Sequence, residues 1–290
     1  SGTHTIQPLS ALPTITDPVV IDGYSQPGSR MNSNPQESGL NTVLMIELDG
    51  SRAGAGVHGL EIGADNSTLR GLVINRFSGS GVRISGHHGN RAMGSFLGTD
   101  ITGTIGLANG GAGVRIEGAA HDNVVGTDGD GVADGTEANL ISANAEYGIF
   151  IQGIGTDRNA IAGNCIGTDV TGARALGNGL NPATSGVGSG VHVTNGAQSN
   201  RIGTDGNGVS DYLERNVISA NRFDGIVISS YPQPARYNVV AGNFVGTDAT
   251  GRLPLGNGHN GMDVAFSASS TRIGTNGDGV ADDAERNLFS

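Results

Sequence analysis

Three short segments of the chain place carboxylate and amide side chains at one repeated spacing. Each segment begins with Gly-Thr and runs through a glycine-bearing turn to a glutamate. Oxygen ligands at alternate positions around such a turn form the donor set that Ca²⁺ requires. The predicted ligands are Asp128, Asp130, Asp134 and Glu137 in the first segment, Asp205, Asn207, Asp211 and Glu214 in the second, and Asn276, Asp278, Asp282 and Glu285 in the third.

The first segment is the best candidate because all four of its positions are acids, whereas each of the other two has one Asn. We expect a structural role for the ion, because a catalytic ion would not need three copies. The alternative is a polar Asp/Gly turn that holds only water.

A second repeated segment, Gly-Thr-Asp, supplies Asp100, Asp169 and Asp248. A glycoside hydrolase needs two carboxyl groups roughly 5 to 9.5 Å apart. If these aspartates recur only at every third coil of a solenoid, neighbours lie about 14 Å apart. The spacing therefore predicts that they do not form a catalytic pair.

Arg83 and Arg115 occupy the same position in two Gly-Val-Arg-Ile segments, and His192 and Asp263 follow at equivalent positions. This polar line is either a solvated face or a surface that contacts an acidic glycan, and the two arginines are the candidate catalytic residues if the chain is an enzyme. His87, His88 and His121 are either metal ligands or exposed loop residues.

These residues belong to repeats that must position them. The first glycines of the acidic segments, Gly126, Gly203 and Gly274, are 77 and 71 residues apart. Short apolar strands begin after Asn several times within each unit, for example after Asn123 and Asn139. We therefore predict a repeating unit of three coils.

Segments such as Gly148-Ile-Phe-Ile alternate branched apolar residues with a variable residue, which is the period-2 pattern of a half-buried strand. Strands this short need to be stacked, with Asn ladders at the corners. The prediction is an all-β, right-handed, single-stranded parallel β-helix of roughly ten coils. Residues 1–50 form atypical N-terminal coils, with strands at 18–22 and 43–48 and a polar excursion from Tyr24 to Asn41, and residues 51–290 form one continuous repeated solenoid.

Composition narrows the possible partners. The net charge of −11 disfavours nucleic acid and anionic membranes, because no basic patch would release counterions. The sequence contains no long apolar run of the kind that would predict membrane insertion. Cys165 is the single cysteine, which excludes an internal disulfide and predicts a small buried apolar residue. Strand edges at the two ends of the solenoid predict possible end-to-end self-association.

The run from Thr5 to Gly23, the phrase Leu72-Val-Ile-Asn-Arg-Phe77 and the recurring NVISAN, GNFVGTDATG and LGN resemble right-handed parallel β-helix repeat proteins. These are the pectin-lyase-like repeats of large secreted or surface proteins of bacteria. The resemblance spans nearly the whole chain. The acidic segments are also similar to the calcium loops of type 3 thrombospondin repeats and dockerins.

The resemblance implies an extracellular or cell-surface location and possible contact with polysaccharide or a surface glycan. It leaves activity open, because the same architecture carries lyases, hydrolases, adhesins and passive stalks. Near-identical repeats favour a non-catalytic stalk or adhesion segment stabilised by Ca²⁺. The alternative is a polysaccharide lyase or glycoside hydrolase acting in a groove along the helix.

Overall fold

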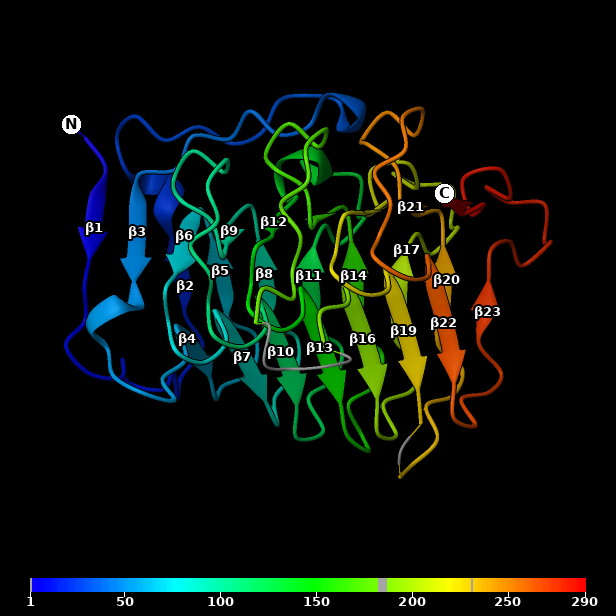
Figure 1. Ribbon diagram of the computed structural model, residues 1–290, viewed down its shortest axis with the longest axis horizontal. Coiled ribbons are helices and arrows are strands. Elements are labelled where there is room, and N and C mark those ends of the chain that lie inside the picture. Colours follow the sequence, from blue (N-terminus) through cyan, green and yellow to red (C-terminus); the bar gives the residue numbers. More distant parts are fainter. Residues whose placement is uncertain (1, 182–186, 231) are drawn as a thin grey trace.

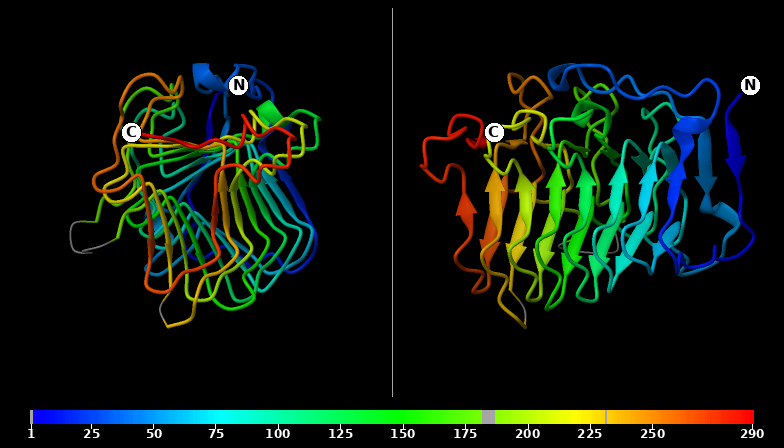
Figure 2. Two further views of the ribbon diagram at one scale, coloured as in Figure 1. Left: turned by 90° about the vertical axis from the view of Figure 1, so that its right-hand side faces the viewer. Right: turned by 180° about the vertical axis from the view of Figure 1, so that it is seen from behind.

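The computed structural model describes residues 2–181, 187–230 and 232–290; Ser1, the first residue of the predicted N-terminal segment, lies outside this range. The chain is a right-handed parallel β-helix, which confirms the predicted fold class (Figure 1). Its described strands form three parallel sheets, which make the three sides of the coil when the molecule is viewed end-on (Figure 2).

Sheet A contains nine strands, which are β1 (His4–Ile6), β3 (Ile46–Asp49), β6 (Leu72–Asn75), β9 (Phe96–Leu97), β12 (Leu140–Ile141), β15 (Cys165–Ile166), β18 (Val217–Ile218), β21 (Phe244–Val245) and β24 (Leu288–Phe289). Sheet B contains seven strands, which are β4 (Leu60–Ile62), β7 (Val82–Ser85), β10 (Val114–Glu117), β13 (Ile149–Gln152), β16 (Val191–Thr194), β19 (Ile226–Ser229) and β22 (Met262–Ala265). Sheet C contains eight strands, which are β2 (Val20–Asp22), β5 (Thr68–Arg70), β8 (Arg91–Met93), β11 (Val124–Gly126), β14 (Ala160–Ala162), β17 (Arg201–Gly203), β20 (Val239–Ala241) and β23 (Arg272–Ile273). Short 3₁₀ turns occur at Gly23–Ser25, Gln36–Ser38, Gly50–Arg52 and Asp134–Thr136.

Each complete coil runs through sheet B, then sheet C, then sheet A. We number the coils from the N-terminus, so that β2 and β3 belong to coil 1, β4 to β6 form coil 2, and each following trio forms the next coil up to coil 8. In coil 1 the sheet B position is marked only by an isolated bridge between Ile15 and Ile62. The described residues form eight numbered coils, slightly fewer than the roughly ten predicted. The difference arises because long loops lengthen each coil.

The interior is filled by rows of branched apolar side chains, one from each coil. In sheet B, Ile84 pairs with Ile116, and Ile116 pairs with Ile151. All three side chains are completely buried. Removing one such side chain from water contributes about 1.5 to 3 kcal/mol, so the stacked rows drive a fold whose individual strands are too short to be stable alone.

Three corners of the coil carry asparagine ladders, as the sequence predicted. At the corner before sheet C, Asn123 Nδ2 donates to Asn159 Oδ1 at 2.9 Å, and Asn159 Nδ2 donates to Asn200 Oδ1 at 3.0 Å. The ladder members are Asn90, Asn123, Asn159, Asn200 and Asn238 before sheet C, Asn139, Asn164, Asn216, Asn243 and Asn287 before sheet A, and Asn109, Asn144, Asn178, Asn221 and Asn257 after sheet A. These bonds satisfy amides that are buried at the corners.

The prediction of a three-coil repeating unit is wrong, because the unit contains two coils. Asn123 precedes β11 and Asn159 precedes β14, so these two residues mark the same corner in successive coils. Asn139 instead precedes β12, at the next corner of the same coil. The sequence signature of an Asn followed by a short apolar strand is the same at both corners, so a corner was counted as a coil.

The polar excursion between β2 and β3 lies along the outside of the solenoid. Residues 24–44, here named the strap, cross the outer face of sheet A above several coils (Figure 1, blue segment at the top). Its Leu40 and Leu44 are buried in an apolar cluster with Phe96, Leu140 and Cys165. Cys165 is therefore a small buried apolar residue, as predicted, although it lies beneath the strap rather than inside the coil.

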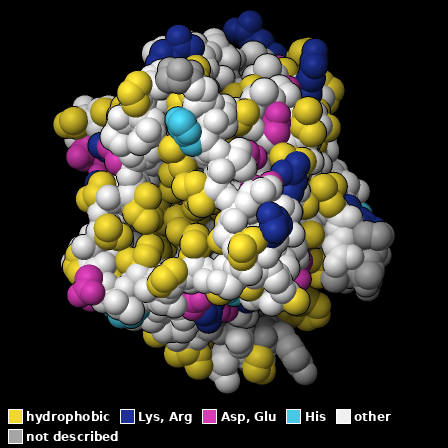
Figure 3. All heavy atoms as spheres, turned by 90° about the vertical axis from the view of Figure 1, so that its left-hand side faces the viewer, with side chains coloured by type: hydrophobic (Ala, Val, Ile, Leu, Met, Phe, Trp, Pro, Cys, Tyr) yellow, Lys and Arg dark blue, Asp and Glu magenta, His cyan; other side chains and the backbone are white. Residues whose placement is uncertain are grey.

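The predicted strands at 18–22 and 43–48 correspond to β2 and β3. The N-terminal end of the solenoid shows a hollow lined by apolar side chains (Figure 3). Leu12, Ile15 and Ile21 pack partly exposed against the core there. Within the described residues, no helix is long and apolar enough to cross a membrane.

Candidate cation-binding loops and the polar face of sheet B

The three acidic segments form loops at one corner of the solenoid, between sheet C and sheet A. They connect β11 to β12, β17 to β18 and β23 to β24, in coils 4, 6 and 8. A Cβ atom at Gly129 would lie 2.5 Å from Oε1 of Glu214, and one at Gly206 would lie 2.4 Å from Oε1 of Glu285. Each loop is therefore packed against the next, because the intervening coils turn this corner within a few residues.

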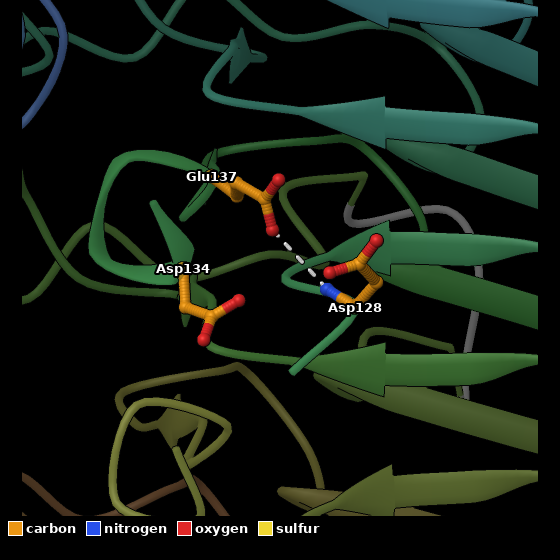
Figure 4. A group of neighbouring side chains, drawn as sticks. All are labelled: Asp128, Asp134 and Glu137. Atoms are coloured by element: carbon orange, nitrogen blue, oxygen red, sulfur yellow. Dashed lines mark hydrogen bonds between the residues drawn. The ribbon is translucent and has the colours of Figure 1, made fainter. Parts of the chain in front are cut away.

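The first loop brings three of its four predicted ligands together. Oxygen atoms of Asp128, Asp134 and Glu137 all lie within 4.8 Å of one another. Figure 4 shows the three carboxylates facing a common space, with the backbone N–H of Asp128 donating to Oε2 of Glu137 at 3.2 Å. Asp130 does not join this group: it is exposed, and its Oδ1 accepts the backbone N–H of Val132 at 2.7 Å in its own turn.

The electrostatics of the first loop favour a cation. Burial raises the pKa of Glu137, and the negative charges of Asp128 and Asp134 raise it further. Thr127 Oγ1 donates to Asp134 Oδ1 at 3.0 Å, and the backbone N–H of Gly131 donates to Asp134 Oδ2 at 2.9 Å. These neutral donors orient the carboxylates but leave their summed charge uncompensated, apart from an ion pair between Asp128 and Arg91 of the preceding coil.

The second loop repeats the cluster with Asp205, Asp211 and Glu214. Here a resident cation is present, because Arg201 Nη1 donates to Glu214 Oε1 at 2.6 Å and to the carbonyl oxygen of Gly203 at 2.5 Å. Asn207 is held in its own turn, where its Oδ1 accepts the backbone N–H of Val209 at 2.7 Å. Burial also raises the pKa of Glu214, although Arg201 opposes the shift.

The third loop keeps the arginine but has Asn276 in the position of Asp205. Arg272 Nη1 donates to Glu285 Oε1 at 2.8 Å and to the carbonyl oxygen of Gly274 at 2.7 Å. Asn276 donates from Nδ2 to Asp278 Oδ2 at 2.9 Å, and Thr275 donates to Asp282 Oδ1. The position of Arg201 and Arg272, at the start of the preceding strand, is occupied by Val124 before the first loop. The first loop is thus the one copy of the three without its own arginine.

The aspartates of the second repeated segment cap the turns that follow sheet A. Asp100 Oδ1 accepts the backbone N–H groups of Thr104 and Ile105 at 3.1 and 3.0 Å. Asp169 and Asp248 make the same kind of contact in the later copies. Because the repeating unit is two coils, neighbouring copies lie about 10 Å apart by strand spacing rather than the predicted 14 Å. Their carboxylates are nevertheless occupied by the turns.

The outer face of sheet B carries the predicted polar line. Arg83 pairs in register with Arg115, and the row continues through Phe150, His192 and Val227 to Asp263. The two arginines are ion-paired within the sheet: Arg83 contacts Glu61 and Glu117, with Nε at 2.7 Å from Glu117 Oε1, and Arg115 Nη1 lies 3.0 Å from Glu117 Oε2.

Glu117 is the residue that links the two arginines, and the sequence reasoning missed it. Burial opposes its charged form, but hydrogen bonds from Gln152 and Arg83 and the nearby charge of Arg115 hold the pKa of Glu117 below its usual range. Its position two residues after Arg115 in the same strand, hence on the same face, was the available signal. Arg115 also lies over the ring of Phe150, 4.8 Å from its centre.

His192 sits beyond Phe150 on this face and is largely buried. Its Nε2 lies 2.9 Å from Ser229 Oγ, and the rings of Tyr147 and Phe150 meet it edge-on at 5.1 and 5.5 Å. Burial lowers the pKa of His192 to about 4. The imidazole is therefore neutral near pH 7, and its Nδ1 is buried without a hydrogen-bond partner among the described residues.

The loop histidines lie at the corner between sheets B and C. The Nδ1 atoms of His87 and His88 are each 3.0 Å from Asp65 Oδ1, and His121 Nδ1 is 2.7 Å from Asp122 Oδ2. The rings of His88 and His121 stack with their centres 5.0 Å apart. Among the described residues, the groups with three close ligand atoms are those of the first and second acidic loops, and none includes a histidine.

Comparisons with known proteins identified no similar protein. No protein-family model matches the sequence, no curated protein matches it, and no solved structure matches the fold closely enough to be counted as similar. The assignment of the chain to the parallel β-helices consequently rests on its own strand order and register.

Proposed function

We propose that the chain is a non-catalytic, extracellular or cell-surface β-solenoid segment that serves a larger bacterial protein as a stalk, adhesion or carbohydrate-contacting module. We also propose that it belongs with the pectin-lyase-like repeats. The main observation in support is that the recurring polar side chains stabilise the turns and corners of the repeated coils. The aspartates Asp100, Asp169 and Asp248 cap turns, and the corner asparagines bond to one another.

The second part of the proposal is that Ca²⁺ stabilises the solenoid at the corner between sheets C and A, where the acidic loops lie. Three carboxylates within 4.8 Å of one another in the first loop support it, as does the raised pKa of Glu137. A divalent cation would offset the charge repulsion that remains among the three carboxylates beside the neutral donors and the one ion pair with Arg91. The first loop is the strongest candidate, because Glu214 and Glu285 are ion-paired with Arg201 and Arg272, whereas the only arginine paired in the described first loop, Arg91, contacts Asp128 and leaves Glu137 to its neutral donors.

Thermal unfolding tests the calcium proposal. The melting temperature is measured in excess EGTA and again after titration with CaCl₂, with MgCl₂ as the control cation. Saturating Ca²⁺ at about one hundred times its dissociation constant would add about 2.7 kcal/mol. Equal melting temperatures in EGTA and in Ca²⁺ would sink the proposal.

A second candidate function is that of a polysaccharide lyase or glycoside hydrolase. The observation in its favour is the cluster of Arg83, Arg115, Glu117 and His192 on one face of sheet B. A depolymerisation screen on acidic polysaccharides, with the Arg83→Ala and Arg115→Ala variants as controls, distinguishes the two functions. Chain cleavage that both variants abolish would replace the stalk proposal with the enzymatic one.

End-to-end association of two copies is a further part of the stalk proposal. The described C-terminal coil exposes Val264, Ile273 and Phe289, and the N-terminal hollow offers apolar side chains at the opposite end (Figure 3). Parallel strands stacked head to tail would continue the same pairing. Sedimentation over a range of concentrations measures this association; a monomer at all concentrations would remove it from the proposal.

A further inference from the structure

The strap makes contacts that a solenoid does not ordinarily contain. In stacked repeats each coil touches only its neighbours, so stability is nearly a sum of local terms and the ends can open independently. The strap begins and ends in coil 1, between β2 and β3, yet its residues reach across the outer face of sheet A to coil 6.

The reach of the strap is fixed by hydrogen bonds to four successive coils. Tyr24 Oη donates to the carbonyl oxygen of Gly94 in coil 3 at 2.6 Å, and Asn32 Nδ2 donates to that of Gly135 in coil 4 at 2.8 Å. The Leu40 N–H donates to the carbonyl oxygen of Val170, just after coil 5, at 2.8 Å. Gln36 Nε2 donates to the carbonyl oxygen of Arg215, in the acidic loop of coil 6.

The strap is itself ordered as a hairpin. Arg30 and Val43 exchange backbone hydrogen bonds of 2.9 and 2.8 Å in an antiparallel bridge. Asn32 Oδ1 accepts the N–H of Asn41 at 3.1 Å across the hairpin. These internal bonds restrict the strap to one shape, and such restriction lowers the entropy lost when a segment docks.

Apolar burial adds to these polar anchors. Leu40 and Leu44 cover the outward side chains of sheet A, Phe96, Leu140 and Cys165, from coils 3, 4 and 5. Gly39 approaches so closely that a Cβ there would lie 2.5 Å from backbone atoms of Thr171. The tip of the strap is thus seated in a tight apolar contact with coils far from its own in the sequence.

We propose that the strap is a latch, which couples coils 1 to 6 into one cooperative unit and shields the single cysteine of the chain. The contacts of the strap depend neither on calcium binding nor on the proposed function. The described hydrogen bonds and apolar contacts of the strap end at coil 6, so coils 7 and 8 provide an internal reference within the same molecule.

Cys165 reports directly on the latch. The intact chain is treated with a thiol reagent under native conditions, and the modification rate is followed by mass spectrometry. Leu40→Ala removes buried packing and is expected to raise the rate at least about tenfold. Gly39→Ala is expected to have a similar effect, because its added methyl group displaces the tip from Thr171.

A matched control is available in Gly56→Ala. Gly39 and Gly56 both have a positive φ, of +65° and +71°, but a Cβ at Gly56 meets nothing within 4 Å. Both substitutions place a side chain at a positive φ, and only Gly39→Ala brings the added methyl group against another segment of the chain. Labelling of the Leu40→Ala and Gly39→Ala variants at the rate of the Gly56→Ala protein would overturn the latch.

Amide hydrogen exchange separates coupling from simple covering. In the Leu40→Ala protein we expect faster exchange in β12, β15 and β18 and unchanged exchange in β22, which belongs to coil 8. Faster labelling of Cys165 with unchanged exchange in β12 and β18 would mean that the strap only covers the thiol, and the coupling would be rejected. Leu40→Ala preserves the backbone of the strap, so it keeps the test open if the Gly39→Ala variant does not fold.

Discussion

Arg201 donates to Glu214 across 2.6 Å inside the second acidic loop, and the residue that replaces this arginine before the first loop is Val124. The loops are otherwise close copies. Glu137 in the first loop therefore faces Asp128 and Asp134 without the positive charge that Glu214 receives from its own strand. In the second loop an arginine of the same coil therefore pairs with the buried glutamate, whereas in the first loop the ion pair is made by Asp128 with Arg91 of the preceding coil.

Val124→Arg is expected to make the first loop resemble the second and to abolish most of the stabilisation by calcium. The new guanidinium would bind Glu137 and the carbonyl oxygen of Gly126, as Arg201 does with Glu214 and Gly203. Melting temperatures in EGTA and in CaCl₂ should then nearly coincide. Val239→Arg, at the same strand position in coil 7, where no acidic loop follows, is the control. A calcium-dependent shift as large as that of the unmodified chain would contradict the prediction.

In the absence of calcium, Glu137 should contribute to the pH dependence of the free energy of unfolding. Its folded-state pKa lies above the ordinary value of 4.5, so the folded state binds this proton more tightly than the unfolded state. Its contribution to stability is complete below pH 4.5 and is lost as the pH rises through the raised pKa. Glu137→Gln should be more stable than the original chain at pH 7 in EGTA. Urea unfolding at several pH values measures this, and equal or lower stability of the variant would count against it.

His192 should produce the opposite dependence. Its pKa falls from 6.5 to about 4 on folding, so its contribution to stability is present above pH 6.5 and is lost as the pH falls toward 4. A shift of this size corresponds to roughly 3 kcal/mol at most. His192→Gln should flatten the acid limb of the unfolding curve between pH 6.5 and 4. The exposed His259→Gln serves as the control, and an acid limb unaltered by the His192 change would refute the assignment.

Removing one member of an asparagine ladder should be costly. Asn159 is completely buried and bonds to Asn123, Asn200 and the carbonyl oxygen of Ala120. Asn159→Ala leaves several buried partners unsatisfied, so we expect a loss of about 2 to 4 kcal/mol. Asn260→Ala, at an exposed position, should change stability by less than about 0.5 kcal/mol. Comparable losses from the two substitutions in urea unfolding would show that the ladder is not what stabilises the corner.

Much of the fold could be predicted because stacked coils repeat local rules. Gly148-Ile-Phe-Ile predicts a half-buried strand, and β13 lies there, although its outward Phe150 is buried as well. The corner ladders follow from Asn at fixed positions, since each amide can pair with its copy in the next coil. The number of coils in the repeating unit could not be predicted correctly, because the strands after Asn123 and Asn139 look alike in sequence. They nevertheless form different sides of the same coil.

The acidic residues were found from their spacing, but their roles were divided by the tertiary structure. Spacing gave Asp128, Asp130, Asp134 and Glu137 equal standing as ligands. The turn leaves Asp130 exposed and outside the group, whereas Thr127 donates to Asp134, whose carboxylate lies beside those of Asp128 and Glu137. Whether Ca²⁺ binds there stays a prediction.

By itself the sequence determined the parallel β-helix, its apolar interior and the residues at its acidic corner, because each of these follows from side-chain periodicity within one coil. Only the tertiary structure decided which residues of different coils meet. It placed Glu214 against Gly129 and seated the strap over Cys165. Contacts of this kind join positions that are tens of residues apart or more, and no local period encodes them, since they depend on how the coils stack and where each loop is long enough to reach.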